Sequence, residues 1–116
     1  MPEMIAVGVV IAIHIAIAIV EMCLWDRPSI HSRLGFDRHT AKLVAPIVAN
    51  AGLYNAFIAS GLIWGQTRWG GSNSTLFFLA CVIVAGVFGA VTLKWTTLLL
   101  QSLPGAIAFG CGWMSC

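Results

Sequence analysis

The sequence predicts an all-α membrane protein, an antiparallel bundle of four transmembrane helices that forms a single domain over residues 1–116. Hydrophobic residues make up 59% of the chain and charged residues only 9%, whereas a soluble domain carries about 25% charged residues. The charged side chains are also clustered, so that three long stretches contain no Asp, Glu, Lys or Arg: 43–67, 69–93 and 95–116. Each stretch reaches the roughly 20 residues that span a bilayer.

The first predicted helix covers residues 4–25, which are almost entirely Ile, Val, Ala, Leu and Met. Its middle alternates like a strand, but a membrane strand needs only about 9–11 residues and a closed barrel. Four segments of this length cannot close a barrel, so a helix is favoured. The residues before the apolar run include acidic Glu3 and no basic residue, and the apolar run is longer than that of a signal peptide. We therefore expect a retained helix that Pro28 terminates.

The next three helices are predicted near 42–64, 74–93 and 96–114. The long polar connection 26–42 carries four basic residues, and Asp37 or Thr40 is placed to cap the helix that follows. The third connection, on the same side, holds Lys94, whereas the second holds only Arg68. The positive-inside rule then predicts a multi-pass protein of the cell membrane with loop 26–42 in the cytoplasm and both termini outside.

Several side chains are assigned structural roles. Small residues at helical spacing predict a packing stripe on the second helix, formed by Ala45, Ala49, Gly52, Ala56 and Ser60. Tryptophans near the predicted span ends are typical of an aromatic belt: Trp25, Trp64, Trp69, Trp95 and Trp113. His31 and His39 lie in the polar loop and are expected to be solvated. Cys111 and Cys116, near the outer face, are the cysteines for which oxidation is conceivable.

Polar side chains inside the apolar helices form the candidate site. An ionisable group in hydrocarbon costs several kcal/mol, roughly 2.5 or more on insertion scales, and by default marks a functional site. Glu21 is such a group, and His14 lies seven residues earlier on the same helical face. We expect the Glu21 carboxyl to face the bundle interior and to pair with a polar group on the second or fourth helix.

Counting from the cytoplasmic ends at about 1.5 Å per residue arranges the polar residues in layers. Glu21 falls in one layer with Asn50 and Gln101, which are therefore its first candidate partners. The candidate catalytic residues are Glu21 and His14, and the candidate ligand-binding residues are Asn50, Tyr54, Asn55 and Gln101. No cofactor is indicated, and no metal site, because His14 and Glu21 are about 10 Å apart along the helix axis.

Three functions fit these residues. The favoured one is binding or transport of a small, partly apolar molecule. The alternative is a membrane-embedded enzyme, an isomerase, cyclase or hydrolase acting on a lipid-like substrate, with Glu21 and His14 as general acid and base. The third is a structural or accessory subunit whose polar residues only hold helices together. The expected partner is the lipid bilayer, a homodimer is compatible with the sequence, and nothing indicates nucleic-acid binding.

A family resemblance extends over nearly the whole chain, with its parts in the same order. It is carried by four groups of residues: His14 with Glu21-Met22 and Trp25; Asn50-Ala51-Gly52-Leu53-Tyr54-Asn55; Cys81-Val82-Ile83-Val84-Ala85-Gly86; and Gln101-Ser102-Leu103-Pro104. These resemble a family of small integral membrane proteins called domain of unknown function 1304. The Asn-x-Gly-Leu-Tyr-Asn run is the most specific part. The resemblance implies a four-span membrane protein and supplies no established activity.

Overall fold

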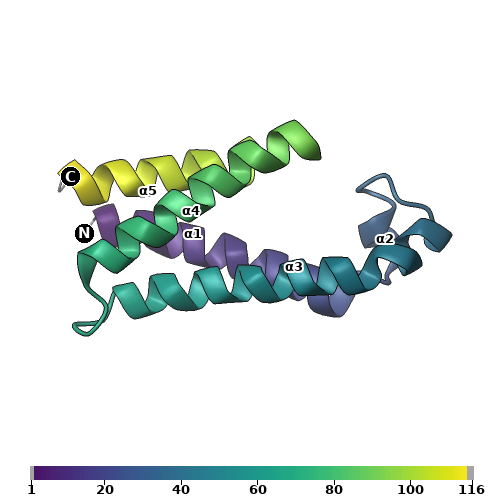
Figure 1. Ribbon diagram of the computed structural model, residues 1–116, viewed down its shortest axis with the longest axis horizontal. Helices are drawn as coiled ribbons and strands as arrows, with labels where there is room; N and C mark the ends of the chain where they lie inside the picture. The colour runs from purple at the N-terminus through teal and green to yellow at the C-terminus, as the bar shows by residue number, and fades with distance from the viewer. Residues whose placement is uncertain (1, 115–116) are drawn as a thin grey trace. The chain divides into compact units, whose positions relative to one another are not determined.

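The computed structural model describes residues 2–114, and within this range the chain is helical without any strand. The order of elements is α1 (Pro2–Ile19), η1 (Val20–Leu24), α2 (Pro28–His31), α3 (Arg38–Gly65), α4 (Gly71–Thr92), η2 (Leu98–Ser102) and α5 (Leu103–Met114). Figure 1 labels the five α-helices. The two η elements are π-helical turns that continue α1 and precede α5. The predicted all-α class is confirmed.

Three helices are long and apolar enough to cross a membrane: Glu3–Leu24, Arg38–Gly65 and Gly71–Thr92. They correspond to the first three predicted spans. The fourth predicted span, 96–114, corresponds to Leu98–Met114, which is apolar but shorter. Three long apolar helices suggest membrane insertion, whereas a bundle of four spans is not confirmed.

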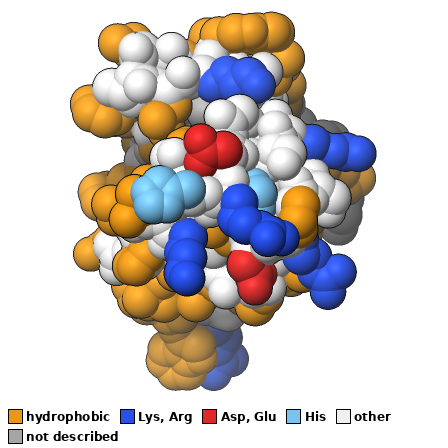
Figure 2. Space-filling view, turned by 90° about the vertical axis from the view of Figure 1, so that its right-hand side faces the viewer, with side chains coloured by type: hydrophobic (Ala, Val, Ile, Leu, Met, Phe, Trp, Pro, Cys, Tyr) orange, Lys and Arg blue, Asp and Glu red, His pale blue; other side chains and the backbone are white. Residues whose placement is uncertain are grey.

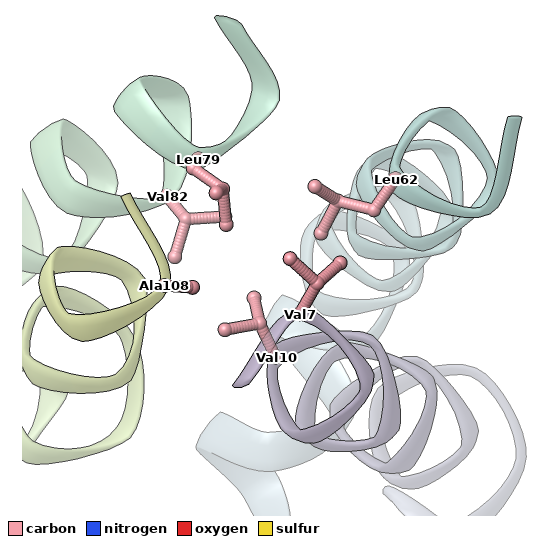
Figure 3. Close-up of a cluster of buried hydrophobic side chains, with 6 residues drawn as sticks. All are labelled: Val7, Val10, Leu62, Leu79, Val82 and Ala108. Atoms are coloured by element: carbon pink, nitrogen blue, oxygen red, sulfur yellow. The ribbon is translucent and has the colours of Figure 1, made fainter. Parts of the chain in front are cut away.

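The chain divides into two compact units, which we call the core unit, Met1–Ile13 with Ile58–Cys116, and the loop unit, His14–Phe57. In the core unit α1, α3, α4 and α5 each contribute to one cluster of buried side chains (Figure 3). The cluster is aliphatic throughout and consists of Val7, Val10, Leu62, Leu79, Val82 and Ala108. Burial of a Val or Leu side chain contributes about 1.5–3 kcal/mol when the reference environment is water.

Helix α4 packs antiparallel against η2 and α5 within the core unit, and the two helices lie side by side in Figure 1. Gly86 faces Ser102, and Gly105 faces Val82, so the contacts run in opposite directions along the two segments. Two side-chain hydrogen bonds join them. Ser102 Oγ donates to the Ile83 carbonyl at 2.9 Å, and Thr97 Oγ1 donates to the Gly86 carbonyl at 2.7 Å.

The loop unit differs from the sequence prediction around Trp25. This side chain is only 6% exposed, and its indole N–H donates to the Ala41 carbonyl at 2.9 Å. Its ring also meets Phe36 edge-on, with 5.5 Å between ring centroids. Trp25 is therefore buried within the loop unit and is not part of an aromatic belt. The other four tryptophans are exposed, as a belt requires: Trp64, Trp69, Trp95 and Trp113.

His31 is also buried, at 4% exposure, so the expectation that it would be solvated is wrong. The reason is local: Pro28 starts the short helix α2, which brings the His31 ring to 6.5 Å from the Trp25 ring, centroid to centroid. There His31 Nδ1 lies 3.1 Å from the Phe36 carbonyl in a hydrogen bond. His39 is exposed, as expected.

Asp37 caps the start of α3, one of the two residues placed to do so. Its Oδ1 accepts the Thr40 backbone N–H at 2.7 Å, which satisfies one of the helix's unpaired amides. The Thr40 amide holds the pKa of the Asp37 carboxyl below its usual value because it stabilises the charged form. With this cap, α3 begins at Arg38, four residues before the predicted start at residue 42.

The packing stripe predicted on α3 is confirmed in part: Gly52 is buried and Ala45, Ala49 and Ala56 are half-buried, whereas Ser60 is exposed. The helix also buries Ala41 and Ala59, which lie within about 20° of Gly52 around the helix axis, and it buries Leu62 in the core unit. Ser60, eight residues after Gly52, is turned by about 80° from it and is exposed. Gly52 is therefore the small residue that sets the approach to α3 in the loop unit.

Cys23 and Cys81 are free thiols, of which Cys23 is exposed and Cys81 half-buried. Cys111 is disulfide-bonded. The other cysteine named with it, Cys116, lies outside the described residues.

Candidate functional site

The Glu21 carboxyl pairs with a polar side chain of α3. Asn55 Nδ2 donates a hydrogen bond to Glu21 Oε1 at 2.8 Å, and both residues are partly buried. The partner lies on the second predicted helix, as expected, but it is Asn55 rather than Asn50 or Gln101. An acid and an amide are thus held together within a segment of otherwise apolar sequence.

Gly52 makes this pairing geometrically possible. A Cβ atom at this position would lie 2.6 Å from Met22 Cγ, 3.0 Å from Glu21 Cβ and 3.3 Å from the Ala18 carbonyl oxygen. The α3 backbone therefore approaches the end of α1 and η1 more closely than any other residue would allow. Asn55 is three residues further on, one turn along the same side of the helix, where its amide reaches Glu21.

Glu21 lies in the π-helical turn η1, a feature that the sequence analysis missed. Single π-turns inside α-helices are rare and occur frequently at functional sites. No glycine or proline occurs in Val20–Leu24 to signal the turn. The acidic residue itself is the only sign in the sequence that this part of the first helix is unusual.

The second π-turn, η2, contains Gln101 and has a visible cause in the sequence. Pro104 lacks an N–H and its ring collides with the carbonyl four residues earlier in a regular α-helix. Here Leu103 N donates to the Leu98 carbonyl, five residues back, so the backbone is already widened just before the proline. Gln101 is half-buried in the core unit, and its grouping with Glu21 stays a prediction.

Two of the predicted ligand-binding residues lie on another side of α3. Asn50 and Tyr54 are each two residues from Gly52, which turns them by about 200° around the helix, and both are exposed. The Tyr54 ring contacts Phe57, with 5.8 Å between centroids. Asn50 was wrongly chosen as the partner because depth along the helix was compared without the direction of the side chain, and the side of α3 that faces η1 is that of Gly52.

His14 is the most deeply buried polar residue of the candidate set, with 1% of its surface exposed. It belongs to the loop unit and lies on α1, before the π-turn. His14 and Glu21 share one helical face only if the turns between them are regular α-helical turns, and Glu21 lies in the π-turn. A direct role beside Glu21 stays a prediction.

The hydrogen bond between Glu21 and Asn55 uses one polar atom of each side chain. Within residues 2–114, their mutual bond uses Glu21 Oε1 and Asn55 Nδ2, and no buried side-chain nitrogen or oxygen lacks a partner. Glu21 Oε2 and Asn55 Oδ1 are the two side-chain oxygens that take no part in this mutual bond. A carboxyl group can accept a hydrogen bond, or donate one when protonated, and the amide oxygen accepts. In the same part of the chain, no three His, Cys, Asp or Glu residues are grouped to hold a metal ion.

A family model matches most of the chain. The model of a family described as protein of unknown function (DUF1304) matches residues 8–113, a range that includes all six candidate residues. No curated protein and no solved structure matches the chain.

Proposed function

Because the chain belongs to the family described as protein of unknown function (DUF1304), whose description names no activity, we propose a function from the Glu21–Asn55 pair. The chain is an integral membrane protein that binds or transports a small, partly apolar molecule. The carboxyl and the amide take the polar group of that molecule, and the surrounding helices contact its apolar part.

Membrane insertion is supported by the distribution of exposed side chains. Beyond the three long apolar helices, large hydrophobic residues on helix surfaces are far more exposed than a soluble protein would allow. Ile47 is 71% exposed, Val91 82% and Ile107 55%. Lipid tails cover such residues without cost. We extend the proposal to four antiparallel spans, with Leu98–Met114 as the shortest.

The observation that carries the proposed binding function is the hydrogen bond between Glu21 and Asn55 in apolar surroundings. A carboxyl group among hydrocarbon is costly, and a purely structural bond between helices does not need one. The pair is only partly buried, so it is accessible to a ligand. A molecule with a hydroxyl, amide or carboxyl group on an apolar body complements its two remaining oxygens.

Substitution of Glu21 is expected to remove the ligand. We expect the purified wild-type protein to carry a small molecule, detected by mass spectrometry of an organic extract, and Glu21→Leu to carry at least tenfold less. A hydrogen bond to a charged group contributes about 1.5–3 kcal/mol, and about 1.4 kcal/mol corresponds to tenfold in affinity. Glu21→Gln keeps the shape and one hydrogen bond but removes the titrating proton, so it separates proton-dependent binding from simple hydrogen bonding.

Asn50→Leu is the matched control, because Asn50 is an exposed amide on another side of the same helix. It is expected to retain the ligand at the wild-type level, whereas Asn55→Leu should lose it as Glu21→Leu does. Equal amounts of small molecule in the wild type and the Glu21 and Asn55 variants, or none in the wild type, would contradict the proposed binding function.

We also propose the orientation that the basic residues predict, with loop 26–42 in the cytoplasm and both termini outside. Two exposed serines test it: Ser32 in that loop and Ser72 near the start of α4. In a background without native cysteines, Ser72→Cys should react with a membrane-impermeant thiol reagent in intact cells. Ser32→Cys should react only after permeabilisation, and the reverse pattern would invert the topology.

A further inference from the structure

The exposed basic residues of the loop unit gather on one surface. Figure 2 shows Lys and Arg side chains together on the face of the molecule where α2 lies. The segment from Asp26 to Lys42 supplies four exposed cations and two carboxylates, one of which, Asp37, caps α3. We call the four cations the basic cap: Arg27, Arg33, Arg38 and Lys42.

The chain segment that carries the basic cap is folded, with contacts between its own residues. The indole N–H of Trp25 bonds to the Ala41 carbonyl, which ties the end of η1 to the first turns of α3. Phe36 packs on the Trp25 ring and its carbonyl bonds to His31. The segment that carries the cations therefore has buried aromatic contacts of its own, and its arginines are presented from a fixed backbone.

The basic cap also lies at a fixed depth relative to the apolar helices. Arg27 is three residues beyond Leu24, where the first candidate span ends, and Arg38 is the first residue of the next one. Leu34 is 50% exposed beside Arg33, in a turn where Gly35 has a φ of +84°. Cations next to an exposed apolar side chain, directly outside apolar helices, are typical of a surface at the headgroup level.

We infer that the basic cap binds the phosphate groups of anionic phospholipids in the leaflet on its own side of the membrane. The inference rests on the membrane insertion proposed above. Arginine presents a planar fork of donors that matches phosphate oxygens bidentately. The charge is complementary, because segment 26–42 carries four cations and two carboxylates and an anionic leaflet attracts basic residues close to a membrane end.

Lipid selectivity measured in vesicles tests the inference. The full-length protein is reconstituted in phosphatidylcholine with a trace of spin-labelled phosphatidylglycerol or spin-labelled phosphatidylcholine. Electron spin resonance then gives the fraction of each label that the protein immobilises. We expect a preference for phosphatidylglycerol of roughly fivefold, the equivalent of one basic residue near the surface, and a decrease in that preference as NaCl screens the charges.

Replacing the four cations of the basic cap with glutamine should abolish the preference. Arg68→Gln is the control, because Arg68 is an exposed arginine on the connection between α3 and α4, where it stacks on Trp69 at 5.0 Å. It should leave the preference unchanged. Should the fourfold variant fail to fold, Arg33→Glu changes a single exposed position and should lower the preference severalfold.

Two results would overturn the inference. One is equal immobilisation of both lipids by the wild type, or retention of the preference by the fourfold variant or by Arg33→Glu. The other is loss of the preference when glycerol 3-phosphate is added at constant ionic strength, which would assign the cap to soluble phosphate esters. Membrane insertion is tested separately, by association with pure phosphatidylcholine vesicles that resists extraction with carbonate. A protein that does not insert is thereby distinguished from one that inserts without selecting anionic lipids.

Discussion

Replacing Gly86 with valine will separate α4 from η2 and lower the free energy of unfolding by about 3 kcal/mol or more. A Cβ atom at Gly86 would lie 2.6 Å from the Ser102 backbone nitrogen and 3.0 Å from Gln101 Cβ, and would collide with Ser102 Oγ. Because one of these atoms belongs to the backbone, no rotation of a side chain relieves the overlap. The segments must move apart.

That movement also breaks hydrogen bonds. Ser102 Oγ to the Ile83 carbonyl and Thr97 Oγ1 to the Gly86 carbonyl both cross the contact, and each contributes on the order of 1 kcal/mol. Reversible unfolding of the protein in mixed micelles with increasing SDS, followed by circular dichroism, measures the loss. Gly110→Val is the matched control, because nothing lies within 4 Å of a Cβ at Gly110. A Gly86→Val protein as stable as this control would show that α4 and η2 do not pack as described.

Replacing Gly52 with valine will disrupt the candidate site itself. The added methyl groups must displace Met22, whose Cγ belongs to a flexible side chain, but also Glu21 Cβ and the Ala18 carbonyl, which cannot swing away. Overpacking of this kind costs about 1–3 kcal/mol. We expect α3 to shift from η1, the Asn55–Glu21 bond to lengthen beyond its 2.8 Å, and the bound small molecule to be lost.

The measurement combines the SDS unfolding midpoint with mass spectrometry of the extracted ligand. Gly8→Val on α1 is the control, because a Cβ there meets nothing within 4 Å, and it should keep both stability and ligand. Retention of the ligand by Gly52→Val at the wild-type level would show that ligand binding does not depend on the close approach of α3 to η1. It would count against Glu21–Asn55 as the binding site.

Charge and hydropathy were sufficient to predict the helices but not their ends. Hydrocarbon excludes charged residues, so charge-free stretches give α4 almost as the structure has it, Gly71–Thr92 against the predicted 74–93. The same rule fails where a helix continues beyond the apolar region. Helix α3 includes Arg38 and Lys42 because Asp37 caps it in the polar loop. Hydropathy does not predict a capping hydrogen bond of this kind.

For the candidate site, the sequence identified the acid but not its geometry. Glu21 stands out because its burial in an apolar segment needs a reason. Its partner depends on which side of α3 faces η1, and composition does not determine that rotation. The available signal was Gly52, since a residue that permits close approach identifies the contact side and points to Asn55 one turn later. Trp25 and His31 were misjudged because burial inside a short polar loop depends on contacts distant in sequence.

The π-turn η1 has a consequence for the winding of the first helix. A turn closed over five residues holds one residue more than a regular α-turn, so α1 before Ile19 and the chain after Leu24 follow two different helical wheels. Deleting one residue between positions 20 and 24 would keep the helix continuous while rotating one part against the other by roughly 100°. The number of residues in η1 thus sets the direction of the Glu21 carboxyl. A change between π-helical and α-helical winding in η1 would turn this carboxyl toward or away from Asn55 without unfolding either helix.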